Sequence, residues 1–137
     1  MRSRNRIFAS LAAVALLSAA AAGAAFADRK HERDDLYEKA AAMTGGDIRR
    51  GEVAFSSYGC GGCHTLKGVP QASGKVGPPL DGIAARAIIG GRLENKPSNL
   101  MLWISEPQKV APGTAMPDLD VTPADARDIA AFLYTNS

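Results

Sequence analysis

The segment "YGCGGCHTLKG" at residues 58–68 constrains this chain more than any other feature of its sequence. It contains both cysteines of the 137-residue chain, Cys60 and Cys63, separated by two glycines, and His64 directly after the second cysteine. Two thiols and an imidazole at this spacing are compatible with a redox dithiol, a structural disulfide, a zinc site or the covalent attachment of a haem. The remainder of the sequence has to decide between these chemistries.

The N-terminal residues have the pattern of a targeting segment. Three arginines within residues 1–6 precede a long apolar run, which ends in the A-x-A pattern of Ala25–Ala27 just before the first acidic residue. This pattern is typical of a cleaved secretion signal, so we expect residues 1–27 to be removed and the mature chain to work in a bacterial periplasm. The alternative is an uncleaved membrane anchor, because the apolar run is about long enough to span a bilayer.

Removal of the leader changes the charge balance of the chain. The whole sequence has 16 Lys and Arg against 14 Asp and Glu, and three of the arginines lie in the leader. The mature chain then has 13 basic and 14 acidic residues, which is close to neutrality. Nucleic-acid binding depends on clustered cations, so we expect no nucleic-acid partner. A membrane partner is expected only if the leader is retained.

The 110 residues after the leader divide into a charged segment, 28–46, and a more tightly patterned segment, 47–137. We expect the first to be a solvated extension and the second to be one small domain. Within the extension, four apolar residues at helical spacing are compatible with a short amphipathic helix. These residues are Leu36, Tyr37, Ala40 and Met43.

Two helices are expected in the first two thirds of the domain. Asp47 is a good N-cap for a helix that runs to about Ser57, where Gly59 follows and ends it. A second helix is expected at residues 99–106, because its apolar residues recur on one side and Pro107 prevents continuation.

The third helix has the clearest start signal. Thr122 is a typical N-cap, Pro123 occupies the first helical position, and an apolar stripe follows. Long loops rich in glycine and proline, 66–82 and 107–121, connect the three helices. No convincing pair of alternating strands is present, so the sequence predicts an all-α domain with long loops.

Loops of this length leave a small domain with too few side chains to form a dense core. A large apolar cofactor would complete that core. C-x-x-C-H is the attachment sequence of c-type haem, in which both thiols form thioethers with the haem and the histidine reaches the iron. We therefore interpret Cys60, Cys63 and His64 as the site of one covalently bound haem c, with His64 as an iron ligand.

The other chemistries fit the sequence less well. A redox dithiol is expected at the start of a helix that follows a buried strand, and that context is missing. A zinc site needs further ligands, and the second histidine of the chain, His31, lies in the charged extension. A disulfide between Cys60 and Cys63 closes a tiny loop and adds little stability. A haem-free dithiol oxidoreductase is kept as an alternative from a different functional class.

Met116 is the candidate for the sixth iron ligand. It lies in the loop "VAPGTAMPD", which has no apolar periodicity, whereas Met43 and Met101 lie on helical stripes typical of core packing. A thioether opposite an imidazole favours ferrous iron and leaves no position open for a substrate. This ligand pair predicts an electron carrier and not an enzyme. The alternative is a haem-binding subunit or sensor domain in which Met116 is labile and an external ligand binds the iron.

Residues 47–137 resemble the monohaem class I cytochromes c. The motifs that carry the resemblance are CGGCH at residues 60–64, GPPL at 77–80, WISEP at 103–107 and PGTAMP at 112–117. The resemblance implies the cytochrome c fold, in which three main helices and long loops surround one covalent haem. It also implies that the first and last helices cross, with Gly51 allowing close approach and Phe55 packing against Phe132.

The resemblance further implies roles for residues around the haem. The carbonyl of Pro78 would accept the Nδ1 proton of His64, Arg86 would face a haem propionate, and Trp103 would line the pocket. A protein of this kind is a monomer that carries one electron between larger redox proteins, whose identity the sequence does not give.

This chain differs from the mitochondrial members of that family, which are strongly basic around the haem edge. The mature chain is nearly neutral, and only Lys67, Lys75 and Lys109 are close in sequence to the expected rim of the pocket. We therefore expect docking of redox partners to rely on an apolar patch around the haem edge more than on long-range charge attraction.

Overall fold

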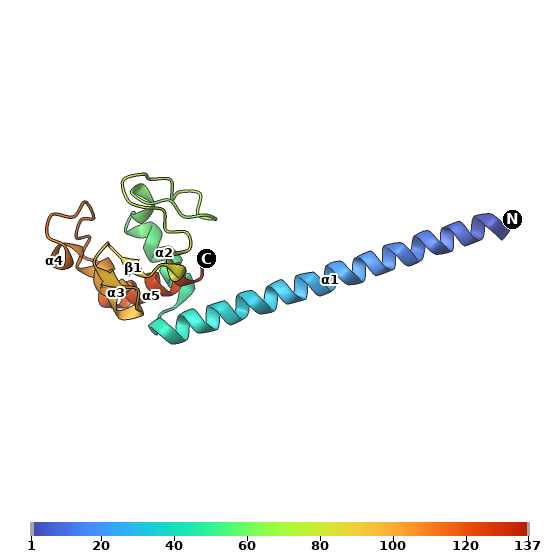
Figure 1. Ribbon diagram of the computed structural model, residues 1–137, viewed down its shortest axis with the longest axis horizontal. Helices are drawn as coiled ribbons and strands as arrows, with labels where there is room; N and C mark the ends of the chain where they lie inside the picture. Colours follow the sequence, from blue (N-terminus) through green and yellow to red (C-terminus); the bar gives the residue numbers. More distant parts are fainter. Residues whose placement is uncertain (1, 137) are drawn as a thin grey trace. The chain divides into compact units, whose positions relative to one another are not determined.

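The computed structural model describes residues 2–136, with side chains from residue 15 onward, and the chain forms two compact units, Met1–Asp35 and Leu36–Ser137. Helix α1 (Arg2–Thr44) provides the first unit and the start of the second (Figure 1). The leader arginines lie outside the described side chains. Among the described residues, none of the helices has the combination of length and hydropathy required to cross a bilayer.

The end of α1 is part of the second unit. Ala40 is 3% exposed and belongs to the hydrophobic core, and Thr44 is 6% exposed. The segment 28–46, expected to be a solvated extension, is therefore helical as far as Thr44, and its last residues are packed into the domain. Met43 is 55% exposed, so its interpretation as core packing was wrong. On this helix the buried positions are taken by small residues, which leave the longer side chains on the outer face.

Helix α2 (Ile48–Ser57) confirms the first expected helix and its cap. The Asp47 carboxylate accepts a hydrogen bond from the backbone N–H of Arg50 at 2.8 Å, which satisfies one of the free donors in the first turn. The chain leaves the helix through Gly59, whose φ of 71° lies in the left-handed region that glycine adopts without strain. The next residue is Cys60, so the end of α2 positions the cysteine motif.

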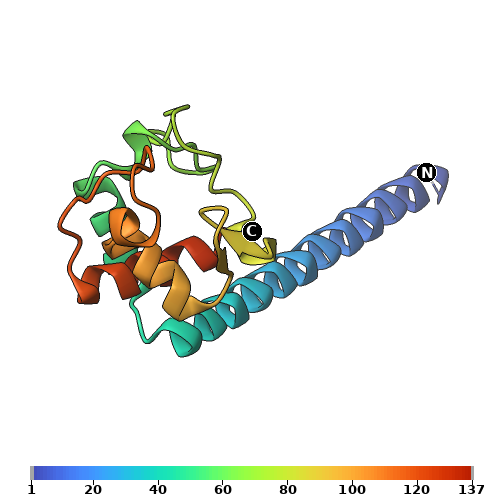
Figure 2. The same cartoon turned by 60° about the vertical axis from the view of Figure 1, so that its left-hand side comes forward.

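Helix α5 (Pro123–Tyr134) confirms the third expected helix. The Thr122 hydroxyl accepts from the backbone N–H of Asp125 at 3.1 Å, and Pro123 occupies the first turn. The buried residues of α5 face both α2 and α3 (Pro97–Ser105), and α5 packs against each of these helices (Figure 2).

The contact between α2 and α5 depends on a glycine and an aromatic pair. A Cβ atom at Gly51 would lie 1.9 Å from the backbone oxygen of Asp128, so only glycine permits this approach. One turn further along α2, the rings of Phe55 and Phe132 have centroids 5.7 Å apart and planes tilted by 60°, a favourable aromatic arrangement. The implied crossing of the first and last helices of the domain is present.

A buried carboxylate links the same two helices. The side chain of Asp128 is 8% exposed and accepts from the Arg50 Nε at 2.7 Å and from the Asp47 backbone N–H at 2.7 Å. The hydrogen bond from the Arg50 guanidinium is the main reason why the pKa of Asp128 is lowered, and burial of the carboxyl opposes it. This interaction fastens the start of α2 to the middle of α5.

The second expected helix was placed too late in the sequence. Helix α3 begins at Pro97, which therefore lies in its first turn, and it ends at Ser105. The loop expected at 107–121 begins with a further short helix, α4 (Pro107–Val110), which Pro107 starts. A proline ends one helix because it lacks an N–H, and for the same reason it fits the first turn of the next.

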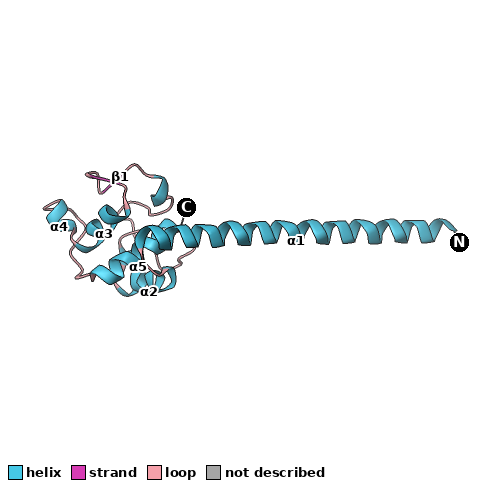
Figure 3. Ribbon diagram, turned by 90° about the horizontal axis from the view of Figure 1, so that it is seen from below, coloured by secondary structure: helices cyan, strands magenta, loops and turns pink. Residues whose placement is uncertain are grey.

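A short hairpin was not expected from the sequence. Strands β1 (Ile88–Ile89) and β2 (Leu93–Glu94) pair antiparallel, and Gly90-Gly91 form the turn with φ values of 56° and 70°. Strands of two residues are too short to display an alternating pattern. Short 3-10 helices, η1 (Cys60–Gly62) and η2 (Ile83–Ala85), lie in the long connection between α2 and β1. The unit is otherwise built of helices and long loops, as predicted (Figure 3).

Candidate functional site

A cavity of about 240 Å³ lies within the second unit, and apolar side chains form nearly all of its lining. Its walls come from α2, α3, α5 and the long loops. The larger apolar lining residues are Phe55, Val76, Leu80, Ile83, Ile88, Ile89, Leu100, Ile104, Leu119, Val121, Ile129 and Leu133. An apolar cavity that reaches the centre of so small a domain leaves the core incomplete until a large apolar ligand fills it.

The cysteine motif forms one wall of this cavity. The 3-10 turn η1 brings the backbone N–H of His64 to 3.0 Å from the carbonyl oxygen of Cys60, so the motif folds back on itself. Cys60, Cys63 and His64 therefore all line the cavity, and both cysteines are free and half-buried. Burial raises the pKa of the Cys60 thiol to about 11. A redox dithiol needs a lowered thiol pKa, so this environment does not favour the dithiol alternative.

The imidazole of His64 is held by two contacts, with Pro78 and with Gly77. Its Nδ1 lies 2.7 Å from the carbonyl oxygen of Pro78, and because a carbonyl can only accept, Nδ1 carries a proton, which in the neutral imidazole leaves the lone pair on Nε2. Gly77 packs against the ring so closely that a Cβ atom there would lie 2.2 Å from Cε1. The structure thus contains the contact that the resemblance implied for Pro78.

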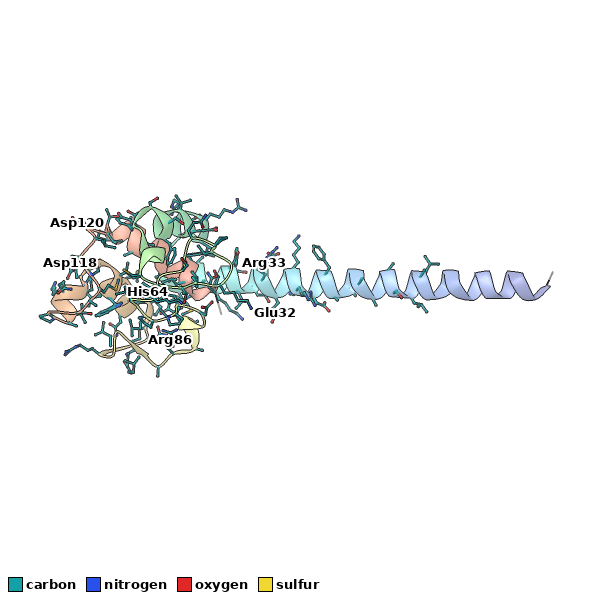
Figure 4. All side chains as sticks on the ribbon, turned by 90° about the horizontal axis from the view of Figure 1, so that it is seen from above. Glu32, Arg33, His64, Arg86, Asp118 and Asp120 are labelled. Atoms are coloured by element: carbon teal, nitrogen blue, oxygen red, sulfur yellow. The ribbon has the colours of Figure 1, made fainter. Side chains whose placement is uncertain are left out.

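Arg86 follows η2 and also lines the cavity (Figure 4). Its Nη2 donates to the carbonyl oxygens of Pro79 and, at 3.1 Å, Asp81. The guanidinium therefore supports the same backbone segment that holds His64. Among the described residues of the lining, Arg86 alone carries a permanent charge, which makes it the candidate partner for an acidic group of a ligand.

The position of Arg86 depends on a residue that the sequence analysis did not identify. The Asn95 side chain donates to the carbonyl oxygens of Ile83 and Arg86 at 2.7 and 2.8 Å, and it accepts from the Tyr134 hydroxyl at 2.9 Å. It therefore connects the segment before Arg86 to the C-terminal helix. The partners of these contacts are 12, 9 and 39 residues away in the sequence. No local pattern around Asn95 predicts them.

Trp103 and Met116, which come later in the sequence, complete the site. Trp103 lies on α3 and lines the cavity, with Gly90 packed against its ring. Met116 lines the cavity together with its neighbours Ala115 and Pro117. All seven site residues predicted from the sequence thus contribute to one cavity.

The residues present fit a haem attached through two thioethers. Two cysteine thiols, an imidazole nitrogen and a methionine sulfur share an apolar cavity with one arginine, and this donor set is suited to an iron porphyrin with two acidic substituents. The donors do not suit a zinc site. Among the described side chains, no three His, Cys, Asp or Glu residues are arranged so that they could hold a metal ion.

Comparisons with known proteins agree with this geometry. The sequence model of the family described as "Cytochrome c" matches residues 48–137, which include every residue of the cavity lining. The cytochrome c oxidase subunit 2 of Alkalihalophilus pseudofirmus is 34% identical over 85 residues, which make up 61% of this chain and 24% of that protein. The chain therefore matches about a quarter of the length of that relative. No solved structure matches the chain significantly.

Proposed function

The chain belongs to the cytochrome c family, and from this premise we propose that it is a periplasmic monohaem cytochrome that carries one electron between larger redox proteins. Membership of the family means that the chain holds haem c covalently through Cys60 and Cys63 and takes part in haem-based electron transfer. The observation that carries the finer proposal is that His64 and Met116 line the same cavity.

His64 and Met116 would be the two protein ligands of the iron. The hydrogen bond from Nδ1 to the Pro78 carbonyl orients the imidazole and makes Nε2 a stronger donor. Met116 would supply a thioether, a soft ligand that favours the reduced metal. When bound, haem c supplies a couple that accepts and returns one electron. If His64 and Met116 both bind the iron, the protein leaves it no free position for a substrate, which supports a carrier and not an enzyme.

The remaining residues of the site would control the surroundings of the cofactor. Arg86 would pair with a propionate, because it is the charged group on the lining and a carboxylate near an apolar cavity needs a cation. Trp103 and the aliphatic walls would exclude water, which raises the cost of the charged ferric state relative to the ferrous state.

Redox partners would dock on an apolar rim. Val76, Ile88 and Leu119 line the cavity and are also 70%, 49% and 37% exposed, so apolar side chains surround its mouth. The mature chain offers little net charge for steering. These observations support an encounter driven by short-range apolar contact, with weak dependence of the association rate on salt.

The periplasmic location is proposed from the leader alone. The arginines of residues 1–6, the apolar run and the Ala25–Ala27 pattern are those of a cleaved secretion signal. The mass of the protein purified from its natural source tests this. A chain that starts at Asp28 in the periplasmic fraction agrees with the proposal, and a full-length chain in the membrane fraction contradicts it.

A second candidate function is a haem-bearing subunit of an oxidoreductase complex. The similarity to part of a cytochrome c oxidase subunit 2 favours it, since that relative is named as a subunit of a larger complex. Gentle extraction followed by native electrophoresis distinguishes the two. A free carrier migrates alone, and a subunit migrates with larger proteins that carry other redox centres.

The carrier proposal is tested on protein purified from cells able to attach haem. We expect the colour to stay with the protein after acid–acetone extraction, a potentiometric titration to fit a one-electron couple, and the reduced protein to resist carbon monoxide. Ready binding of carbon monoxide would show an open or labile iron position. That result would replace the carrier by the sensor or subunit alternative.

A further inference from the structure

The loop that carries Met116 has little internal hydrogen bonding. Among the described residues, no backbone N–H of residues 115–121 donates to a backbone carbonyl. The nearest such bond closes the preceding turn, from the Thr114 N–H to the Ala111 carbonyl at 3.0 Å. A loop of this kind does not hold a side chain in one place without contacts from elsewhere.

Among the described residues, the side-chain hydrogen bonds to the backbone of this loop come from Gln108. Its Nε2 donates to the carbonyl oxygen of Thr114 at 2.8 Å and to the carbonyl oxygen of Met116 itself at 2.6 Å. Its Oε1 accepts from the backbone N–H of Gly113 at 3.1 Å. Both donors and the acceptor of the amide are therefore used on the loop, and the Met116 carbonyl has its hydrogen bond from this side chain.

Gln108 is itself held in place by α4. Pro107, the first residue of that helix, is less than 2% exposed, so the start of α4 is anchored in the core. The backbone N–H of Gln108 has no partner within this first turn, and it donates to the Asp118 carboxylate at 3.3 Å. The Gln108 side chain is half-buried, and the two hydrogen bonds that its Nε2 donates are partly shielded from competition by water.

We propose that Gln108 is a positioning residue that determines how firmly Met116 binds the iron. This inference rests on the proposed function, because it requires Met116 to be the sixth ligand. The amide holds the loop by its backbone on both sides of Ala115, so that the Met116 side chain starts from a fixed point on the cavity wall. Without the amide, the loop samples other conformations, and an external ligand competes with the methionine sulfur more successfully.

The inference is tested with the haem-loaded protein and imidazole as the competing ligand. Gln108→Met keeps the length of the side chain and removes all three hydrogen bonds. Gln108→Glu keeps the acceptor for Gly113 and loses both donors. Lys109→Ala is the matched control, because Lys109 lies next in α4, is exposed, and pairs with Glu106 instead of the loop.

We expect both Gln108 variants to bind imidazole in the ferric state roughly tenfold to a hundredfold more tightly than wild type, as loss of two or three ordinary hydrogen bonds predicts. The amide hydrogen of Gly113 should exchange faster in Gln108→Met, in which its acceptor is gone. The Lys109→Ala protein should match wild type in both measurements. Optical titration and hydrogen exchange provide the two readouts, and neither is an activity assay.

The outcomes separate this inference from the proposed function. If wild type and Met116→Ala bind imidazole equally well, Met116 is not the ligand and the proposed function fails. If wild type resists imidazole, Met116→Ala does not, and both Gln108 variants behave like wild type, the function stands and the role of Gln108 is overturned. An equal increase in the imidazole affinity of Lys109→Ala would also overturn the role of Gln108. General loosening of α4 would then be the cause.

Discussion

His64 illustrates how single contacts prepare this protein for its cofactor. The Pro78 carbonyl accepts a hydrogen bond from Nδ1, and Gly77 packs closely against the ring. The ring is thereby fixed in both tautomer and orientation by the protein alone. A donor that is already oriented loses no conformational freedom when it binds the metal.

Replacement of Gly77 tests this arrangement at the level of one residue. A Cβ atom at position 77 would lie 2.2 Å from the His64 ring, so in Gly77→Ala either the ring or the backbone has to move. We expect Gly77→Ala to destabilise the holoprotein by about 1–3 kcal/mol, the usual cost of overpacking. Denaturant unfolding followed by the haem absorbance measures this change.

Gly62→Ala is the control for that experiment. It lies in the cysteine motif, where a Cβ atom would meet nothing within 4 Å, and we expect it to unfold like wild type. Equal stability of Gly77→Ala and wild type would show that the ring is not held from this side.

Some residues of the site follow from the sequence and others do not. The cysteines and His64 stand in one short motif whose spacing suits haem attachment, and Met116 stands in a loop motif that carries the family resemblance, so the sequence was sufficient to predict that they share a site. Asn95 and Gln108 act through side-chain bonds to backbone carbonyls. Any polar residue in any loop could make such bonds, so their roles become visible only when the chain is folded.

Among the elements, the junction of α2 and α5 combines close packing with a buried ion pair. Gly51 and the Phe55–Phe132 pair bring the helices together, and Asp128 accepts from Arg50 and from the start of α2. Because the chain ends of the domain meet here, this junction closes the fold around the cavity.

The pH dependence of stability tests the contribution of Asp128. Its pKa is lower in the folded chain than the ordinary value of about 3.9, so the carboxylate stabilises the fold above about pH 4, and this contribution is lost as the pH falls through the lowered pKa. We expect Asp128→Asn to lower the midpoint of thermal unfolding at pH 7 by several degrees, with a difference that shrinks as the solution is acidified.

Thermal unfolding across this pH range, followed by circular dichroism, provides the measurement. Asp120→Asn removes an exposed loop carboxylate and serves as the control. A difference between Asp128→Asn and wild type that stays constant down to the lowest pH would contradict the assignment, because it would not arise from the carboxylate charge.

The helices were predictable to different degrees, for physical reasons. Helices α2 and α5 begin at side-chain caps, Asp47 and Thr122, which are local signals. Helix α3 has no side-chain cap at Lys96, so its start was placed too late, and α4 is so short that its apolar pattern cannot be distinguished from a loop. The hairpin β1–β2 is held by tertiary packing, which a pattern of two residues does not reveal.

In the molecule as a whole, the compact domain extends further toward the N-terminus than the residues that match the family model. The family match begins at residue 48, whereas the second unit begins at Leu36 and includes the buried residues Ala40 and Thr44. The last turns of α1 are therefore part of the domain that holds the cofactor. The charged composition of this segment did not predict that its last turns pack into the domain, because the residues that are buried are small.

Truncation tests this boundary. A chain that starts at Asp47 loses the packing of Ala40, and we expect its thermal midpoint to fall by several degrees relative to a chain that starts at Asp28. A chain that starts at Leu36 is the control. Residues 28–34 are exposed, so we expect it to be as stable as the longer chain. Equal midpoints for all three chains would place the boundary at residue 47, where the sequence analysis put it.

Optical spectroscopy tests whether Met116 is a ligand of the iron. Optical spectra of wild type and Met116→Ala are recorded in the oxidised and reduced states, on protein from cells able to attach haem. We expect wild type alone to show the charge-transfer band of methionine-bound ferric haem. Identical spectra for the two proteins would contradict it, and Met116 would then not be the ligand.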